Sequence, residues 1–191
     1  QVSEVFTPLR VRLQSLLDEI MGSNTKPSNA FNEIALPIDQ QQKFVRHIAS
    51  QIGFEFEAGR LDESTHPFCS GTHCNDVRLT TRFHENNVND AIGSTMHEAG
   101  HGIYEQGLLF DHAGTPMGHS VSLGIHESQS RMWENQVGRS EAFWKWCYPQ
   151  MEQFFGDATA GLSFEDVYGG ANIVKPDYIR VEADEATYNM H

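Results

Sequence analysis

Residues 94–108 read STMHEAGHGIYEQGL, and two histidines in this stretch, His97 and His101, stand four positions apart. Apolar residues recur at helical spacing from Val88 through Leu108, so we expect the stretch to lie on one helix. Positions i and i+4 of a helix share a face, and two imidazoles placed there can reach one metal ion. The stretch therefore predicts a helix that carries part of a metal site.

Glu98 directly follows the first of these histidines. It lies about 100° around the helix from His97, where a carboxylate can take a proton from a metal-bound water without being a ligand itself. The chain holds 10 histidines and 26 acidic residues, so a polar helix can also show this short motif by chance. The metal hypothesis therefore depends on finding a third ligand.

A catalytic zinc site has three protein ligands and one water. One known pattern supplies a third histidine six residues after the pair, with a glycine between them. Tyr104 and Gly107 occupy those positions, so that pattern fails here. Glu105 is one turn beyond His101 on the same helix and is poorly placed to complete a tetrahedron.

The next expected helix, over residues 121–137, offers two carboxylates. Glu127 lies within the polar run HESQSR, and burial of such a run requires a partner for it. Glu134 follows a Met-Trp pair and is interpreted as part of a solvated face. We therefore predict Glu127 as the third ligand, and the alternative is an ordinary surface carboxylate.

The chain as a whole is expected to be mainly α, with one small β hairpin or sheet. Alternating residues predict a strand near 76–83, which could pair with an extended peptide. The aromatic residues between 143 and 155 are predicted to form core packing. We predict a single domain with N-terminal helices over 1–53, a small β element over 54–83, zinc-binding helices over 86–138 and C-terminal helices over 139–191.

Bulk composition excludes several classes of protein. The net charge of −13 argues against binding to nucleic acid or to an anionic membrane surface. No apolar run approaches the roughly 20 residues of a membrane span. The 3 cysteines are an odd number, which fits a reducing compartment, so a cytoplasmic protein is expected.

A second cluster of metal-binding residue types is an alternative candidate for a metal site. The run HPFCSGTHC, residues 66–74, contains two histidines and two cysteines. Structural zinc sites usually draw on two separated pairs of ligands, and so compact a cluster is sterically awkward. We therefore do not expect a metal site there.

Five short motifs occur in one order along the chain: HPF (66–68), DVRLT (76–80), HEAGH (97–101), HESQSR (126–131) and IRVEAD (179–184). Together the motifs resemble those of the Taq-type metallocarboxypeptidases, which are zinc-dependent helical enzymes with a deep groove. Members are longer, and their C-terminal motif G-x-x-Q-D-x-H-W is absent here. The chain is therefore expected to be an internal fragment of such an enzyme.

The resemblance implies roles for specific residues. His97, His101 and Glu127 become the metal ligands and Glu98 the general base, in agreement with the reading from the residues alone. The implied cofactor is Zn²⁺, for which Co²⁺ or Mn²⁺ can substitute. The implied activity is hydrolysis of the last peptide bond of peptides with a free C-terminus, and the implied assembly of the full-length enzyme is a homodimer.

Substrate-binding residues are less well defined by the sequence. Arg180 and Arg78 are candidates to bind the substrate carboxylate, because Arg pairs with carboxylates through two charge-assisted bonds. Structural ion pairs with nearby aspartates are the alternative for both. His126 is a candidate donor to the developing oxyanion, or else a core or supporting histidine. Two rival functions remain: a zinc endopeptidase of the same helical group, and a metal-binding fragment without activity.

Overall fold

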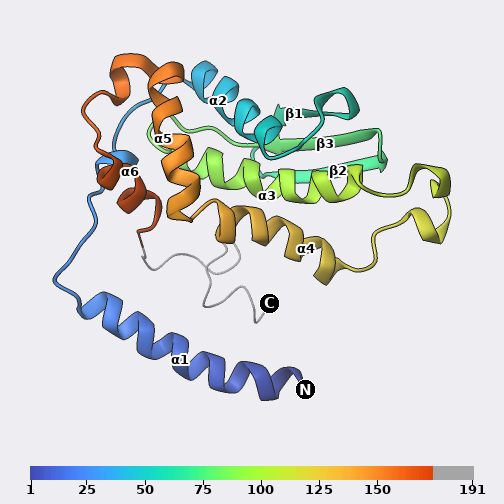
Figure 1. Cartoon of the computed structure of the whole chain (residues 1–191), viewed down its shortest axis with the longest axis horizontal. Coiled ribbons are helices and arrows are strands. Elements are labelled where there is room, and N and C mark those ends of the chain that lie inside the picture. The colour runs from blue at the N-terminus through green and yellow to red at the C-terminus, as the bar shows by residue number, and fades with distance from the viewer. Residues whose placement is uncertain (174–191) are drawn as a thin grey trace. The chain divides into compact units, whose positions relative to one another are not determined.

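The computed structural model describes residues 1–173 (Figure 1). Residues Gln1–Pro27 and Ser28–Ala171 belong to separate compact units, and each is described by itself. In the first, helix α1 spans Val2–Gly22 and none of its side chains is buried.

The second unit contains most of the helices and the sheet. Its main elements are α2 (Ile38–Gln51), β1 (Gly59–Glu63), β2 (Phe68–His73), β3 (Asp76–Thr81), α3 (Val88–Gln106), α4 (Leu123–Arg131), the π-helical segment η5 (Met132–Val137), α5 (Glu141–Phe155) and α6 (Phe164–Ala171). Short 3-10 turns are η1 (Ala30–Asn32), η2 (Phe56–Ala58), η3 (Phe110–His112), η4 (Pro116–Gly118) and η6 (Gly156–Thr159). The mainly helical architecture with one small sheet confirms the expected fold class.

The sheet has the strand order β1-β3-β2. Strand β3 pairs in parallel with β1 and antiparallel with β2, so Leu79 of β3 lies between Leu61 and Cys69. Both edges of β3 are therefore occupied. The prediction that this strand itself takes an extended peptide is wrong, because a central strand has no unpaired backbone edge.

Helix α3 packs against one face of this sheet. Val77 and Leu79 of β3 form a buried cluster with Phe54 and Ala99. A Cβ atom on Gly102 would lie 2.7 Å from the Phe54 ring and 2.9 Å from Leu79 Cδ2, so only glycine fits at this point of α3. Figure 1 shows α3 running between the sheet and α4.

Polar contacts fix both ends of α3. At its start, the Asn87 side chain accepts a hydrogen bond from the backbone N–H of Asp90, and the Arg82 guanidinium donates to both oxygens of Asp90 at 2.7 and 2.8 Å. At its end, the side-chain amide of Gln106 exchanges two hydrogen bonds with the backbone of Glu55. The helix that carries the predicted metal site is therefore held at both termini.

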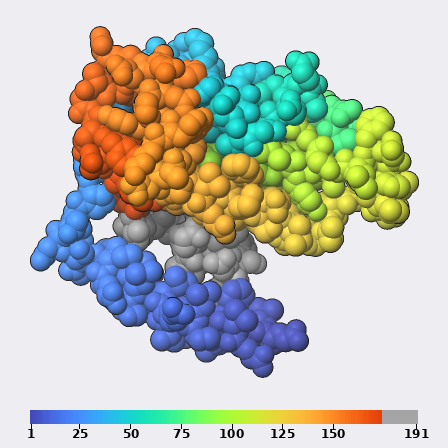
Figure 2. Space-filling model, viewed as in Figure 1, coloured from blue at the N-terminus to red at the C-terminus, as the bar shows by residue number. Residues whose placement is uncertain are grey.

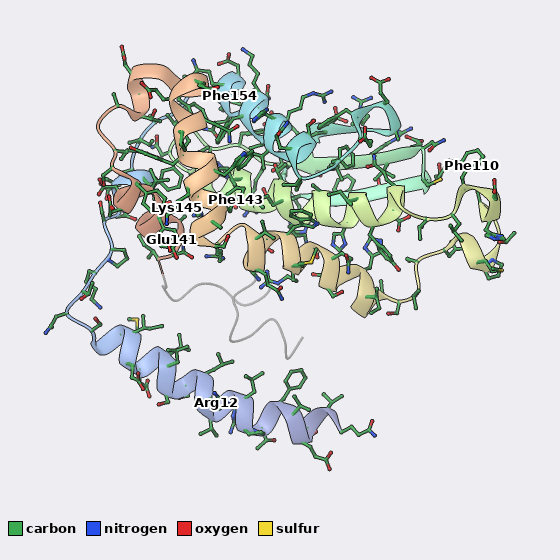
Figure 3. The ribbon with its side chains drawn as sticks, viewed as in Figure 1. Arg12, Phe110, Glu141, Phe143, Lys145 and Phe154 are labelled. Carbon is green, nitrogen blue, oxygen red and sulfur yellow. The ribbon has the colours of Figure 1, made fainter. Side chains whose placement is uncertain are left out.

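The predicted aromatic packing is confirmed for most of α5. Phe143, Trp144 and Phe155 are buried, and the Trp144 indole N–H donates to the backbone carbonyl of Gly138. Phe154 lies beside α2 (Figure 3), with its ring centroid 5.1 Å from that of Phe44. Trp146 is 38% exposed, so α5 contributes one aromatic face to the core and turns the other side to solvent.

The segment between α3 and α4, residues 107–122, is an extended loop. Phe110 projects from it (Figure 3) and, like Leu109, is exposed. The backbone N–H of Val121 donates to the Tyr104 hydroxyl at 3.2 Å. Figure 2 shows this segment, in yellow-green, at one end of the molecular surface. The loop thus connects the two helices without entering the core.

Candidate metal centre

Close packing of α3 on α4 creates the site. A Cβ atom on Gly100 would lie 2.7 Å from the backbone oxygen of Gln129 and 2.7 Å from Ser130 Cα. The two helix backbones therefore approach as closely as glycine permits. Helix α4 begins after Ser122, whose side chain accepts a hydrogen bond from the backbone N–H of Ile125, and it presents Glu127 toward α3.

The three predicted ligands converge across this contact. One ligand atom from each of His97, His101 and Glu127 lies within 4.8 Å of the others. Nε2 of His101 is 3.1 Å from Glu127 Oε2, and Nε2 of His97 is 3.7 Å from Glu127 Oε1. Two imidazole nitrogens and one carboxylate oxygen match the His₂Glu donor set of catalytic zinc sites.

The outer nitrogen of His97 contacts a second carboxylate. Nδ1 of His97 lies 2.8 Å from Glu134 Oε2, and the Arg131 guanidinium donates to the same oxygen at 2.7 Å. The Glu134 side chain is 17% exposed, so the interpretation of this residue as part of a solvated face is wrong. Glu134 is seven residues after Glu127, and that spacing could have placed both carboxylates on one side of the helix.

His101 has an outer contact of a different kind. Its Nδ1 lies 2.6 Å from Nδ1 of His126, and Nε2 of His126 lies 2.6 Å from Glu105 Oε1. Both ring nitrogens of His126 therefore have partners within the protein. This placement favours the supporting role for His126 over the alternative of an oxyanion donor, because an oxyanion donor needs an available N–H.

Burial and neighbouring charges have opposite effects on the pKa values of His97, Glu127 and Glu134. Burial acts to lower the pKa of His97, but the hydrogen bond and charge of Glu134 outweigh it and the pKa is raised. Burial acts to raise the pKa of Glu127, but the adjacent His101 imidazole and the charge of His97 outweigh burial and the pKa is lowered. The pKa of Glu134 is lowered against burial in the same way, chiefly by His97. The carboxylates are thus held in the ionised form that metal binding requires.

Glu98 has a contrasting environment. Its side chain is buried, and burial together with the nearby Glu127 and Glu134 carboxylates raises its pKa to about 7, although His97 acts in the opposite direction. Within residues 1–173, no donor forms a hydrogen bond with its carboxylate. A carboxylate with a pKa near neutrality is suited to accept and return a proton.

Arg78, one of the two predicted carboxylate-binding arginines, does not lie at this site. Arg78 lies on the sheet face opposite the buried Val77 and Leu79, where it is exposed and donates two hydrogen bonds to Asp76. A hollow beside it is lined by Ser70, Gly71, Thr72, Asp76 and Arg78. This arrangement favours the ion-pair alternative for Arg78. Arg180 lies outside the described residues.

The second cluster of metal-binding residue types does not converge. Among the described residues, His97, His101 and Glu127 are the one group whose ligand atoms gather closely enough to hold a metal ion. The Cys74 thiol lies 3.7 Å from Nδ1 of the neighbouring His73. Burial raises the pKa of Cys69 to about 12, which disfavours the thiolate that binds metals.

Comparisons with known proteins point to one family. Residues 1–191 match the family model described as carboxypeptidase Taq (M32) metallopeptidase. The chain is 46% identical to thermostable carboxypeptidase 1 of Thermus thermophilus over 98% of its own length, and 37% identical to carboxypeptidase 1 of Bacillus subtilis over 100%. It covers 36% and 38% of these two relatives.

A solved structure gives the same result. The crystal structure of an M32 carboxypeptidase from Deinococcus radiodurans matches the chain with a TM-score of 0.92 and 42% identity. The match covers 100% of this chain and 38% of that one. The chain therefore spans well under half of the relatives that it matches. Separately, no helix within residues 1–173 combines the length and apolar character of a membrane span.

Proposed function

This chain belongs to the carboxypeptidase Taq (M32) metallopeptidase family, and on that premise we propose that it carries the zinc site of a carboxypeptidase. The proposed reaction is hydrolysis of the C-terminal peptide bond of peptides. Because the chain covers 36–38% of the curated relatives named above, this activity is proposed for the whole enzyme and needs a separate test in the chain itself.

The observation that carries the proposal is the convergence of His97, His101 and Glu127 within 4.8 Å. The Nδ1 atoms of both histidines contact other protein groups, so the Nε2 atoms are left to face an ion. A metal ion held there would supply Lewis acidity toward a water and a carbonyl oxygen. The donor set suits Zn²⁺, and Co²⁺ or Mn²⁺ are proposed substitutes.

Glu98 is proposed as the general base. The buried carboxylate accepts a proton at an oxygen atom from the attacking water and later gives that proton to the leaving nitrogen. In the metal-free chain its pKa is raised to about 7, chiefly by burial, which favours uptake of a proton. Within residues 1–173 no hydrogen-bond donor occupies the Glu98 carboxylate oxygens, which supports a role for them as proton acceptors.

The substrate path is proposed to follow strand β2. This strand pairs with β3 along one edge and, within residues 1–173, has no strand at the other. The charges of Glu98 and Glu105 contribute to the raised pKa of Cys69, so β2 lies near the face of α3 that carries the base. An extended peptide could add to this edge. Arg180 remains the proposed partner of the substrate carboxylate. Arg78, the other candidate for that role, and His126, the candidate oxyanion donor, have protein partners instead.

Two measurements on the 191-residue chain test the proposal. Zinc stoichiometry, measured by atomic emission after dialysis, should be one per chain and should be lost in Glu127→Ala. Hydrolysis of a peptide with a free C-terminus should be abolished in Glu98→Gln, while zinc stays bound. Retention of full zinc stoichiometry in Glu127→Ala would show that another residue is the third ligand.

A blocked C-terminus separates the rival functions. Cleavage that disappears when the peptide is amidated supports the exopeptidase, whereas equal cleavage of both peptides indicates an endopeptidase. Zinc binding without cleavage of either peptide indicates that the chain binds metal but lacks the rest of the groove. A homodimer remains the proposed assembly of the whole enzyme, and light scattering of that enzyme tests it.

A further inference from the structure

We propose that Glu105 and His126 form a relay that fixes the ring tautomer of His101, so that Nε2 of His101 faces the metal ion with its lone pair. Both are positioning residues, since neither contacts the ion in this arrangement. The inference deepens the proposed metal site and rests on it.

Three residues of α3 hold His126 in place. Its Nδ1 lies 2.6 Å from His101 Nδ1 and its Nε2 lies 2.6 Å from Glu105 Oε1. The edge of its ring meets the ring of Tyr104, with centroids 5.1 Å apart. The side chains of His126 and His101 are 18% and 14% exposed, so water competes little for these contacts.

The donor and acceptor roles along the series Glu105, His126 and His101 assign the ring tautomers. The Glu105 carboxylate is only an acceptor, so Nε2 of His126 must carry the proton that it receives. In the neutral ring, Nδ1 of His126 is then an acceptor, and Nδ1 of His101 must be the donor. His101 therefore has no proton on Nε2, the atom that faces Glu127 at 3.1 Å. The relay presents the nitrogen to the metal in the form that binds it.

His97 reaches the same state by a shorter route. Its Nδ1 contacts the Glu134 carboxylate directly at 2.8 Å, which likewise leaves Nε2 unprotonated in the neutral ring. Metal-binding histidines generally donate their other N–H to a carboxylate or a carbonyl, and removal of that partner costs about 10–100-fold in metal affinity. A carboxylate therefore sets the tautomer of both histidines, directly for His97 and through His126 for His101.

Zinc affinity measured by competition with a chelator tests the relay in the 191-residue chain. We expect Glu105→Leu and His126→Leu each to weaken zinc binding by about 10–100-fold. The double variant should bind zinc about as tightly as the weaker-binding single variant, because both changes interrupt the same hydrogen-bonded series of residues. Glu105→Gln keeps an acceptor oxygen and should restore most of the affinity. Glu152→Leu removes an exposed carboxylate on α5 and is the matched control, with affinity unchanged.

Nitrogen-15 NMR of histidine side chains in the zinc-loaded wild-type chain gives an independent readout that needs no variant to fold. The expected spectrum has protons on Nδ1 of His101 and on Nε2 of His126. A proton on Nδ1 of His126 would overturn the relay, as would independent, multiplying losses in the double variant. If the wild-type chain binds no zinc, the proposed metal site itself fails. If it binds zinc but Glu105→Leu binds equally well, only the relay fails.

Discussion

Substitution of Gly100 by alanine tests whether helix packing sets the geometry of the metal site. The added Cβ would lie 2.7 Å from Gln129 O and Ser130 Cα, whereas ordinary contact begins at 3.4 Å. Both atoms belong to the backbone of α4, so they cannot rotate away. Helix α4 must therefore move outward by about 0.7 Å, and Glu127 moves with it.

The expected cost follows from that displacement. Overpacking of this kind costs about 1–3 kcal/mol, which corresponds to a fall in Tm of roughly 2–12 °C for a chain of this size. Metal sites tolerate errors of about 0.2 Å in ligand distance, so zinc affinity should also fall, on the order of tenfold. Thermal unfolding followed by circular dichroism and chelator competition measure the two effects.

Gly93→Ala is the matched control on the same helix. A Cβ atom at Gly93 would meet nothing within 4 Å, and alanine in a helix is favoured over glycine by about 1 kcal/mol. This variant should therefore unfold at the wild-type temperature or a few degrees above it, with unchanged zinc affinity. If Gly100→Ala behaved like Gly93→Ala in both assays, the reasoning that close backbone contact positions Glu127 would be refuted.

Three further predictions concern charge and packing. Glu98→Gln should stabilise the metal-free chain at pH 8 by roughly 3 kcal/mol, because the folded-state pKa of about 7 lies above the ordinary glutamate value of 4.5 and ionisation therefore opposes folding as pH rises. The difference in unfolding free energy should vanish near pH 4.5 in urea titrations with chelator, and equal stability of the two proteins at pH 8 would contradict the prediction. Glu134→Ala should weaken zinc binding by about 10–100-fold, whereas Glu134→Gln, which keeps an acceptor for His97, should weaken it less. Chelator competition measures the zinc affinity of both variants. Equal losses of affinity would exclude a hydrogen-bonding role for Glu134. Trp144→Ala should cost about 3–5 kcal/mol of folding free energy in urea titrations, whereas Lys145→Ala, a change on the exposed side of α5, should cost less than about 0.5 kcal/mol.

The sequence was sufficient where the signal was local and periodic. Helix α3 and the convergence of its histidines with Glu127 could be predicted, because helical spacing fixes which side chains share a face. Strand order could not, because the pairing of β1 with β3 joins residues separated by the whole of β2, and register is set by tertiary packing. The sequence therefore predicted the position of β3 correctly, but it did not show that β3 is the central strand and β2 an edge strand.

The outer contacts of the site were the harder part to foresee. The Met132-Trp133 pair before Glu134 predicts a solvated position for this carboxylate, whereas its spacing of seven residues from Glu127 indicates the same side of the helix. The contact of His126 with Glu105 joins residues 21 positions apart through the packing of α3 on α4. That contact depends on the direction of two side chains across a helix pair, which sequence spacing alone does not define.

The loop over residues 107–122 has an evolutionary consequence. Because contact with α3 at Gly100 positions α4, the length of the connecting loop need not determine where Glu127 lies. Insertions in surface loops are thermodynamically tolerated, since each doubling of loop length costs only about 0.6 kcal/mol. Sequence searches for distant relatives should therefore allow a variable gap between HEAGH and HESQ, while keeping the glycine within the first motif fixed.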